Sequence, residues 1–205
     1  MDRDTAKKQL EAIIGQDLRQ LAEKYEVTVF KDGKKNKGWA GHVIERHLGI
    51  PINSSQAPNF GSWELKTVSL KRLQNGQLTI KETMAITMID LYNVVRTPFS
   101  ESHLLAKMRK ILIAARIWES QREESSLLYS VTEFDLDNPQ TYQQVERDYN
   151  LVRDTIINEG FEALTGRMGV YIQPRTKGAG HGSISRAFYA RTPFLKCIIF
   201  KDRFS

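Results

Sequence analysis

The chain has 205 residues, the usual size of one globular domain, and carries a formal net charge of +6. With 40% hydrophobic and 26% charged residues, it can bury a core and lacks the composition of a disordered chain. No apolar run reaches the roughly 18 residues of a membrane span, and the N-terminus lacks a signal-peptide core, so we expect a cytoplasmic protein without membrane contact. Cys197, the single cysteine, excludes an internal disulfide and a cysteine-based zinc site, and its apolar neighbours predict burial.

Hydrophobic periodicity and turn residues predict alternating helices and strands. The first half is predicted to contain a helix over residues 4–25, a basic loop over 31–37, a helix over 39–48, a polar loop over 52–61, a strand over 62–70, a hairpin turn at 74–77, and strands over 78–80 and 83–89. The second half is predicted to contain a helix after Pro98, a strand over 111–118, a helix over 139–158 capped by Asn138, a strand over 169–173, a mobile loop over 178–182, a strand around Phe188, and a final helix capped by Thr192.

These elements indicate an α/β (α+β) domain with a mixed central sheet flanked by helices. No linker separates the chain, so we expect a single domain over residues 1–205, with room for two lobes.

The positive charge is concentrated towards the C-terminus. Residues 160–205 hold two acids and eight basic residues, namely Arg167, Arg175, Lys177, Arg186, Arg191, Lys196, Lys201 and Arg203. A second basic cluster consists of Lys31, Lys34, Lys35 and Lys37. Concentrated positive charge suits a polyanion, because phosphate contacts release counterions. On charge alone, a solvated basic surface fits equally well.

A carboxylate and an ammonium share one face of the predicted strand over 62–70. Residues two apart on a strand project together, so Glu64 and Lys66 point the same way and Leu65 points into the core. Such a pair can hold a hard cation and stabilise negative charge that develops on a substrate. Because this triplet also arises by chance, an exposed ion pair is the alternative reading.

The segments around this triplet resemble a known family. Lys37-Gly38-Trp39-Ala40-Gly41 opens a helix that carries Glu45, and Asn59-Phe60 precedes Glu64-Leu65-Lys66-Thr67. Further matches are Ser102-His103-Leu104-Leu105-Ala106-Lys107, the segment Tyr171-Ile172-Gln173-Pro174-Arg175-Thr176-Lys177, and Phe188-Tyr189. In this order the segments resemble the MutH-like endonucleases, which include a mismatch-repair nicking enzyme and type II restriction enzymes and belong to the PD-(D/E)xK nucleases.

The resemblance implies roles in catalysis within about residues 37–112. Glu64, the carbonyl of Leu65 and residue 59 would bind Mg²⁺, and Lys66 would be the catalytic lysine. Glu45 would be a supporting acid, and Lys107 would face the scissile phosphate. As ordinary alternatives, Glu45 and Lys107 could be helix-surface charges.

The resemblance also implies contacts with double-stranded DNA, with the recognition elements within about residues 166–205. Lys37, Arg175, Lys177 and Tyr189 would contact DNA, with Arg186 a further candidate. Arginine is well suited to reading guanine, and GATC is the site that the resemblance suggests. The ordinary alternative for Tyr189 is a place in the core.

One position departs from the family pattern. The family has aspartate where this chain has Asn59, and a neutral amide binds a hard dication more weakly than a carboxylate. Either Asn59 replaces an aspartate of a parent protein, or the natural protein is impaired or uses another ligand. The rest of the motif is intact, which favours the first explanation and predicts a chain that binds DNA without cutting it.

The leading hypothesis is a sequence-specific, Mg²⁺-dependent DNA endonuclease of the type II restriction kind, acting as a monomer or homodimer. The first alternative is a MutH-like nicking enzyme that depends on a mismatch-repair activator. A non-catalytic DNA-binding module is the second alternative, and it is favoured only by Asn59. An RNA-binding protein is weakly supported, because no aromatic-rich stacking strand is evident.

Overall fold

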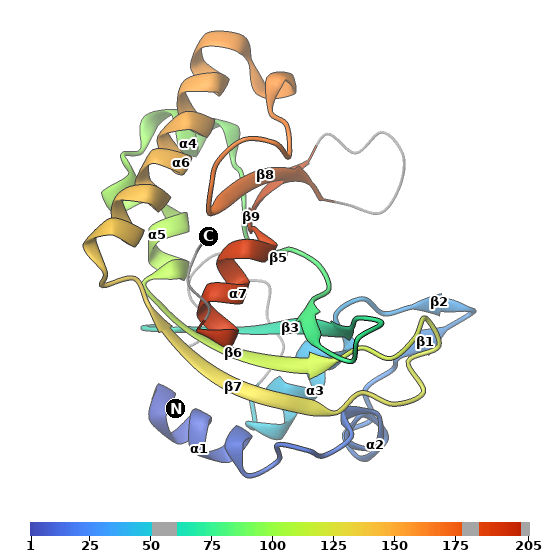
Figure 1. Cartoon of the computed structure of the whole chain (residues 1–205). Helices are drawn as coiled ribbons and strands as arrows, with labels where there is room; N and C mark the ends of the chain where they lie inside the picture. Colours follow the sequence, from blue (N-terminus) through green and yellow to red (C-terminus); the bar gives the residue numbers. More distant parts are fainter. Residues whose placement is uncertain (51–60, 178–184, 202–205) are drawn as a thin grey trace. The chain divides into compact units, whose positions relative to one another are not determined.

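The computed structural model describes residues 1–50, 61–177 and 185–201 (Figure 1). It confirms the α+β class, because helices accompany a four-stranded and a three-stranded sheet. The chain separates into two compact units. Unit 1 comprises Met1–Ser55, Leu65–Glu82 and Leu112–Glu133, and unit 2 comprises Gln56–Glu64, Thr83–Ile111 and Phe134–Ser205. Within the described ranges, no helix is long and apolar enough to cross a membrane.

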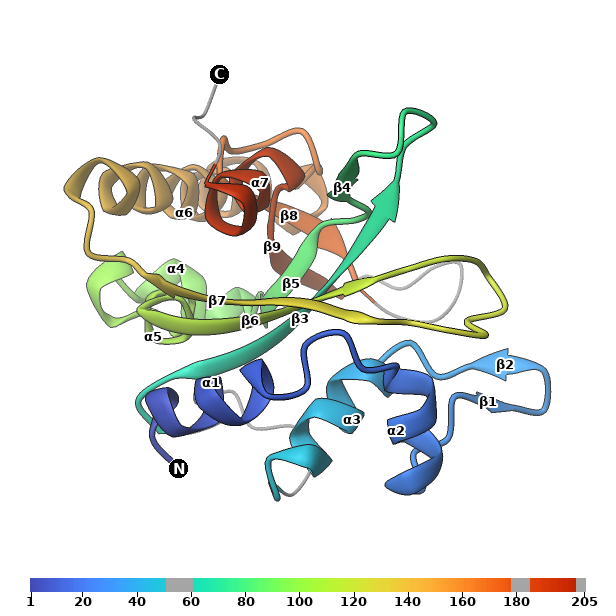
Figure 2. The ribbon, with the colours of Figure 1, turned by 60° about the horizontal axis from the view of Figure 1, so that its bottom comes forward.

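Unit 1 is built on a sheet with the strand order β4-β3-β6-β7. Its elements are α1 (Arg3–Glu11), α2 (Leu18–Lys24), β1 (Phe30–Lys31), β2 (Lys34–Lys35), α3 (Trp39–His47), β3 (Glu64–Arg72), β4 (Leu78–Ile80), β6 (Lys110–Ile117) and β7 (Leu128–Asp135), of which β3, β6 and β7 also extend into unit 2. Figure 2 shows α1, α2 and α3 on one side of this sheet. The predicted turn at 74–77 is confirmed, because β3 and β4 pair antiparallel with Leu70 opposite Ile80. The sequence patterns did not predict β7.

The prediction of one helix over residues 4–25 is wrong, because the chain breaks between α1 and α2. Gly15 has φ +85°, a conformation outside the helical region that glycine adopts at little cost. The amide of Gly15 donates to the carbonyl of Leu128 at 2.8 Å. The carboxylate of Asp17 then caps α2 through the amide of Arg19, at 2.9 Å, and accepts a bond from the amide of Ser126, at 2.8 Å. Long-range bonds to Ser126 and to Leu128, the first residue of β7, therefore hold the chain where the helix is interrupted.

The prediction of a basic loop over residues 31–37 is also wrong, because the segment contains a hairpin. β1 and β2 pair antiparallel, with Phe30 opposite Lys35 and Lys31 opposite Lys34. Asp32 and Gly33 form the two-residue turn with φ values of 50° and 70°. Positive φ at both turn residues, with Asp-Gly in the sequence, is typical of a type I′ hairpin turn.

A buried charge network lies behind this hairpin. The guanidinium of Arg116 donates two hydrogen bonds to Glu123, at 2.7 and 3.0 Å, and one to Ser126 at 2.8 Å. Lys35 forms an ion pair with the same Glu123 carboxylate. The Arg116 guanidinium also lies 5.1 Å from the ring centroid of Trp39, at the start of α3. Because Glu123 is fully buried, these bonds offset the cost of removing its charge from water.

The pKa of Glu123 reflects this setting. Burial acts to raise the pKa of this carboxyl, but the hydrogen bonds from Arg116 and Lys35 outweigh burial and hold the pKa below its ordinary value. A lowered pKa in the folded state stabilises the protein above the ordinary pKa of glutamate, about 4.3. This stabilisation is then lost as the pH falls through the folded-state pKa.

We predict that Glu123→Gln lowers the free energy of unfolding at pH 7 by about 3–5 kcal/mol, because it leaves buried cations without their anion. The difference from the parent chain should narrow as the pH falls below about 4.3. Urea denaturation from pH 3 to pH 8 measures both effects. Glu124→Gln is the matched control, since the side chain of Glu124 is 74% exposed. Equal stability of the two variants at pH 7 would contradict the role of the network.

Unit 2 contains a sheet with the strand order β5-β9-β8. Its elements are β5 (Met84–Met88), α4 (Leu91–Arg96), the 3₁₀ turns Phe99–Glu101 and Phe161–Ala163, α5 (His103–Met108), α6 (Pro139–Glu159), β8 (Ile172–Thr176), β9 (Arg186–Ala190) and α7 (Thr192–Phe200). The predicted start of α6 is confirmed, because the Asn138 side chain accepts bonds from the first-turn amides. The predicted cap of α7 is wrong: Arg191 takes that position, and Thr192 is the first helical residue. The expected mobile loop over 178–182 lies outside the described residues.

β8 begins three residues later than predicted, because a buried carboxylate holds the chain that precedes it. Asp148 of α6 accepts bonds from the amides of Val170, Tyr171 and Ile172 at 2.7–2.9 Å. Gly169 has φ +72°, and a Cβ atom there would lie 1.8 Å from the carbonyl oxygen of Ile172. Val170 and Tyr171 therefore form a bend bound to α6, and the strand starts at Ile172.

Candidate active site

Glu64, the centre of the predicted site, is the first residue of β3. Trp63, Glu64 and Leu65 are 2%, 1% and 6% exposed, so all three side chains are buried. Lys66 is half-buried. The alternative reading of Glu64 and Lys66 as an exposed ion pair is therefore wrong for Glu64. A carboxylate buried this deeply needs a compensating cation or several hydrogen bonds.

The cation comes from α5. The Nζ atom of Lys107 lies 3.2 Å from Oε1 of Glu64, and both side chains belong to unit 2. Lys107 is 6% exposed, so the alternative reading as a helix-surface charge is wrong. Ser102 starts the helix, because its hydroxyl accepts a bond from the amide of Leu105 at 3.1 Å and donates to the carbonyl of Phe99 at 2.8 Å. The spacing of Ser102 and Lys107 thus reflects a cap and a buried lysine in the last turn.

The helix that carries Glu45 lies close to β3 within unit 1. The predicted helix over 39–48 is confirmed as α3. A Cβ atom at Gly41 would lie 3.6 Å from Oγ1 of Thr67, which is van der Waals contact distance, so α3 and β3 approach closely here. Glu45 is half-buried, and its Oε2 atom is inaccessible to solvent. Lys37 is exposed, directly before the capping Gly38, whose amide donates to the Asn36 side chain at 3.0 Å.

The predicted catalytic residues are thus divided between the units. Glu64 and Lys107 belong to unit 2 and form a pair, whereas Lys37, Glu45 and Lys66 belong to unit 1. Asn59 lies outside the described residues. In the part of the chain that the structure describes, no three His, Cys, Asp or Glu side chains are grouped so that they could hold a metal ion.

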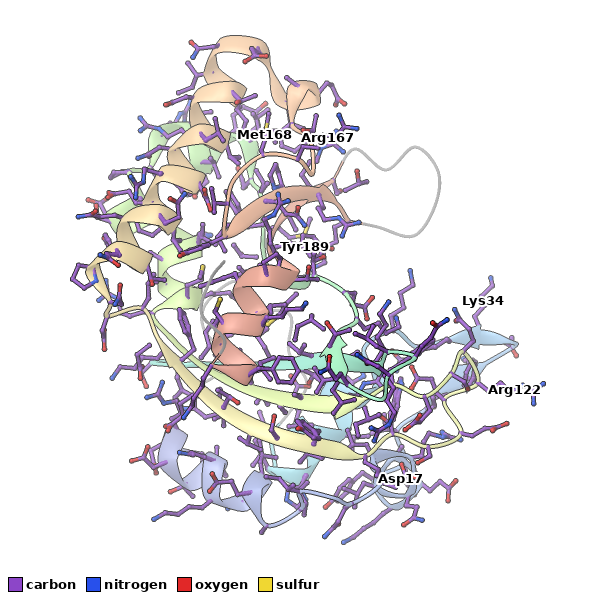
Figure 3. All side chains as sticks on the ribbon, in the orientation of Figure 1. Asp17, Lys34, Arg122, Arg167, Met168 and Tyr189 are labelled. Carbon is purple, nitrogen blue, oxygen red and sulfur yellow. The ribbon has the colours of Figure 1, made fainter. Side chains whose placement is uncertain are left out.

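Arg175 and Tyr189, two of the predicted DNA contacts, lie on neighbouring strands of unit 2. β8 and β9 pair antiparallel with Arg175 opposite Ala187. The exposed guanidinium of Arg175 lies 5.9 Å from the ring centroid of Tyr189 and donates to Oγ1 of Thr83 at 2.9 Å. Tyr189 is half-buried, and Figure 3 marks its position on β9. A buried core position for Tyr189 is therefore excluded, and Arg175 is held in a defined orientation.

The other two predicted contacts differ in their surroundings. Lys177 is exposed, and its backbone amide donates to the carbonyl of Ser185 at 2.8 Å. The guanidinium of Arg186 is half-buried and donates to Oγ1 of Thr176 at 2.6 Å. It also lies 3.7 Å from the carboxylate of Glu162.

Two further residues support this strand pair and were not predicted from the sequence. Asp148 binds the amides before β8, and Arg191 donates to the carbonyls of Met168 and Gly169 at 3.2 Å. A signal for Asp148 was present, because it lies between Val145 and Val152 on the apolar stripe of the predicted helix. An acid on a buried stripe indicates a bound partner. No comparable pattern marks Arg191.

The family model "DNA mismatch repair enzyme MutH" matches residues 48–148. DNA mismatch repair protein MutH of Vibrio campbellii is 24% identical over 92% of this chain and 89% of that protein. The proteins of the same name from Haemophilus ducreyi and Pasteurella multocida are 27% and 28% identical, over 91% and 86% of this chain and 88% and 78% of theirs. The chain is therefore similar to the MutH proteins over most of its length. The resemblance drawn from the motifs is thereby confirmed.

A solved structure also aligns with this MutH-like chain. The complex of restriction endonuclease MvaI with its cognate DNA substrate covers 85% of this chain and 92% of its own, with a TM-score of 0.36 and 13% identity.

We predict that Lys107→Met lowers the free energy of unfolding by about 3–5 kcal/mol, because it removes a buried cation that lies 3.2 Å from the buried Glu64 carboxylate. Adding Glu64→Gln should restore most of this loss, since no charge then remains uncompensated. Urea denaturation of both single variants and the double variant measures the coupling. Lys110→Met, at an exposed position nearby in the sequence, is the control. Additive losses in the double variant would contradict the pair.

Proposed function

We propose that this MutH-like protein belongs to the DNA endonucleases and that its fold serves to hydrolyse phosphodiester bonds at specific sites in duplex DNA. One observation carries the proposal. Glu64 and Lys107 lie 43 residues apart in two separate segments that resemble the family, and they form a buried ion pair. Two residues that match the family pattern only by chance would not be expected to contact each other in the fold. The family resemblance of each segment therefore supports that of the other.

The proposed metal site is centred on Glu64. Mg²⁺ prefers oxygen ligands, and the carboxylate of Glu64 and the carbonyl of Leu65 are adjacent oxygen donors at the start of β3. Asn59 would add only a neutral amide oxygen. One carboxylate is a weak donor set for a hard dication, so we propose that Asn59 limits metal binding in this chain. When bound, the metal would polarise the phosphate and lower the pKa of a water molecule.

The lysines supply positive charge around this carboxylate. Lys66 follows Glu64 by two residues on β3, so the strand period directs both side chains to the same face. We propose that its ammonium stabilises the negative charge that develops on the phosphate. Lys107 compensates the charge of the buried Glu64, and we propose that its ammonium would also be available to a phosphate oxygen of bound DNA. Glu45 is proposed to support the site as a further acid.

Sequence recognition is proposed for the β8–β9 pair. Arg175 is exposed, and Thr83 and Tyr189 orient its guanidinium, which can bond two acceptors on guanine. Lys177 is proposed to contact phosphate. The guanidinium of Arg186 already interacts with Thr176 and Glu162. We therefore propose that Arg186 makes only a peripheral contact with DNA. GATC is the proposed site, and Lys37 is proposed to contact the DNA backbone from unit 1.

Two branches of this activity fit equally well. A restriction enzyme cuts both strands of its site, whereas a mismatch-repair enzyme nicks one strand in response to an activator protein. The relatives named for mismatch repair support the nicking branch. A DNA-binding role without cleavage is the second candidate, and Asn59 favours it for this chain.

We predict that Asn59→Asp raises Mg²⁺-dependent cleavage of plasmid DNA by at least about 100-fold, because loss of an outer partner of a metal ligand alone costs 10–100-fold. Adding Lys66→Ala should abolish the gained activity and leave DNA affinity within a few-fold. Gel analysis separates nicked from linear plasmid and thereby distinguishes the two branches. Asn75→Asp, in the β3–β4 turn, is the control for the added charge.

Strong cleavage by the chain with Asn59 would show that another residue completes the metal site. Equal cleavage before and after Asn59→Asp, at any level, would contradict the proposed role of residue 59.

A further inference from the structure

We propose that the β1–β2 hairpin is a second DNA-contacting element, in which Lys31 and Lys34 both contact the phosphate backbone of duplex DNA. The proposal rests on the proposed function, because it takes duplex DNA as the partner. It concerns unit 1 alone and assigns a role to a segment outside the family motifs.

The pairing of the hairpin sets two like charges against each other. Lys31 and Lys34 are directly opposite residues on antiparallel strands, so their side chains project from the same face. Both are exposed. Like charges in this position destabilise a strand pair, and an anion bound between them would remove the repulsion. The Asp32-Gly33 turn brings the two lysines together at the tip.

The opposite face of the hairpin is anchored. Lys35, which is opposite Phe30, forms an ion pair with the fully buried Glu123, which Arg116 also holds. An isolated two-stranded hairpin is marginally stable in water. The buried network therefore fixes a short hairpin that carries two opposed lysines at its tip. This combination presents the lysines in a defined geometry.

Neighbouring cations favour a polyanion over a single small anion. Lys37, two residues beyond the hairpin, is exposed, and the side chain of Arg122 is 83% exposed beside Glu123. Figure 3 shows Lys34 and Arg122 at the end of unit 1 from which the hairpin projects. Arg122 lies 3.6 Å from Glu124, so its charge is partly offset. Several exposed cations near one hairpin suit a partner that carries many phosphates, such as a DNA strand.

The test is the salt dependence of DNA binding by the full chain. Fluorescence anisotropy with a labelled 25-base-pair duplex is measured over a series of KCl concentrations, once with a GATC duplex and once with a scrambled one. For Lys31→Ala/Lys34→Ala, the slope of log K against log salt should become shallower by about 1.8 units, since two phosphate contacts are lost. Both duplexes should lose affinity to the same degree. Lys34→Ala alone should give half this change and serves if the double variant does not fold.

The matched control is Lys8→Ala/Lys24→Ala, which removes two exposed lysines from α1 and α2. Its slope should stay unchanged. An equal change in the control would show a general effect of net charge and would overturn the proposal. An unchanged slope in the hairpin variant would also overturn it, while leaving the proposed function intact. If the parent chain shows no salt-dependent binding, both proposals fail. Competition by inorganic phosphate that is lost in the hairpin variant would instead assign the lysines to a free anion.

Discussion

The buried ion pair between Glu64 and Lys107 is the constraint on which the candidate active site depends. A carboxylate that is 1% exposed loses nearly all of its hydration, and an isolated buried charge would make folding strongly unfavourable. The ammonium of Lys107, 3.2 Å away, offsets that cost. Its placement depends in turn on α5, whose start is fixed by Ser102. Ser102 starts α5, and Lys107 in its last turn thereby reaches the carboxylate of Glu64.

Buried acids recur as the means by which the chain fixes its functional segments. Glu123 holds Lys35 and Arg116 behind the basic hairpin of unit 1. In unit 2, Asp148 binds three consecutive amides and so sets the first residue of β8, the strand that carries Arg175. In both places, an inaccessible carboxylate orders a short segment whose exposed cations are proposed to contact DNA. Burying a carboxylate costs free energy unless hydrogen bonds replace its hydration. Each of these acids is therefore held by partners in fixed positions.

Local patterns predicted the elements that depend on local physics. Three such predictions are confirmed: the Asn-Gly turn at 75–76, the cap of α6 by Asn138 and the helix α3. Each depends on residues that are close together in the sequence. The break at Gly15 was not predictable in this way, because bonds to Leu128 and Ser126 replace the helical bonds. The role of Lys35 was not predictable either, because its partner Glu123 is distant in the sequence.

The same distinction applies to the site. The strand and the Glu64-Leu65-Lys66 order were readable from the sequence, but the burial of Glu64 depends on Lys107, 43 residues away. The metal site proposed at Glu64 is tested most directly by a crystal structure of the Asn59→Asp/Lys66→Ala protein with duplex DNA and Mn²⁺, recorded with anomalous scattering. If Glu64 and Leu65 form the metal site, a metal peak should lie about 2.1 Å from a Glu64 carboxylate oxygen and from the carbonyl oxygen of Leu65. A peak elsewhere, or no peak while Glu64 remains bound to Lys107, would contradict the proposed site.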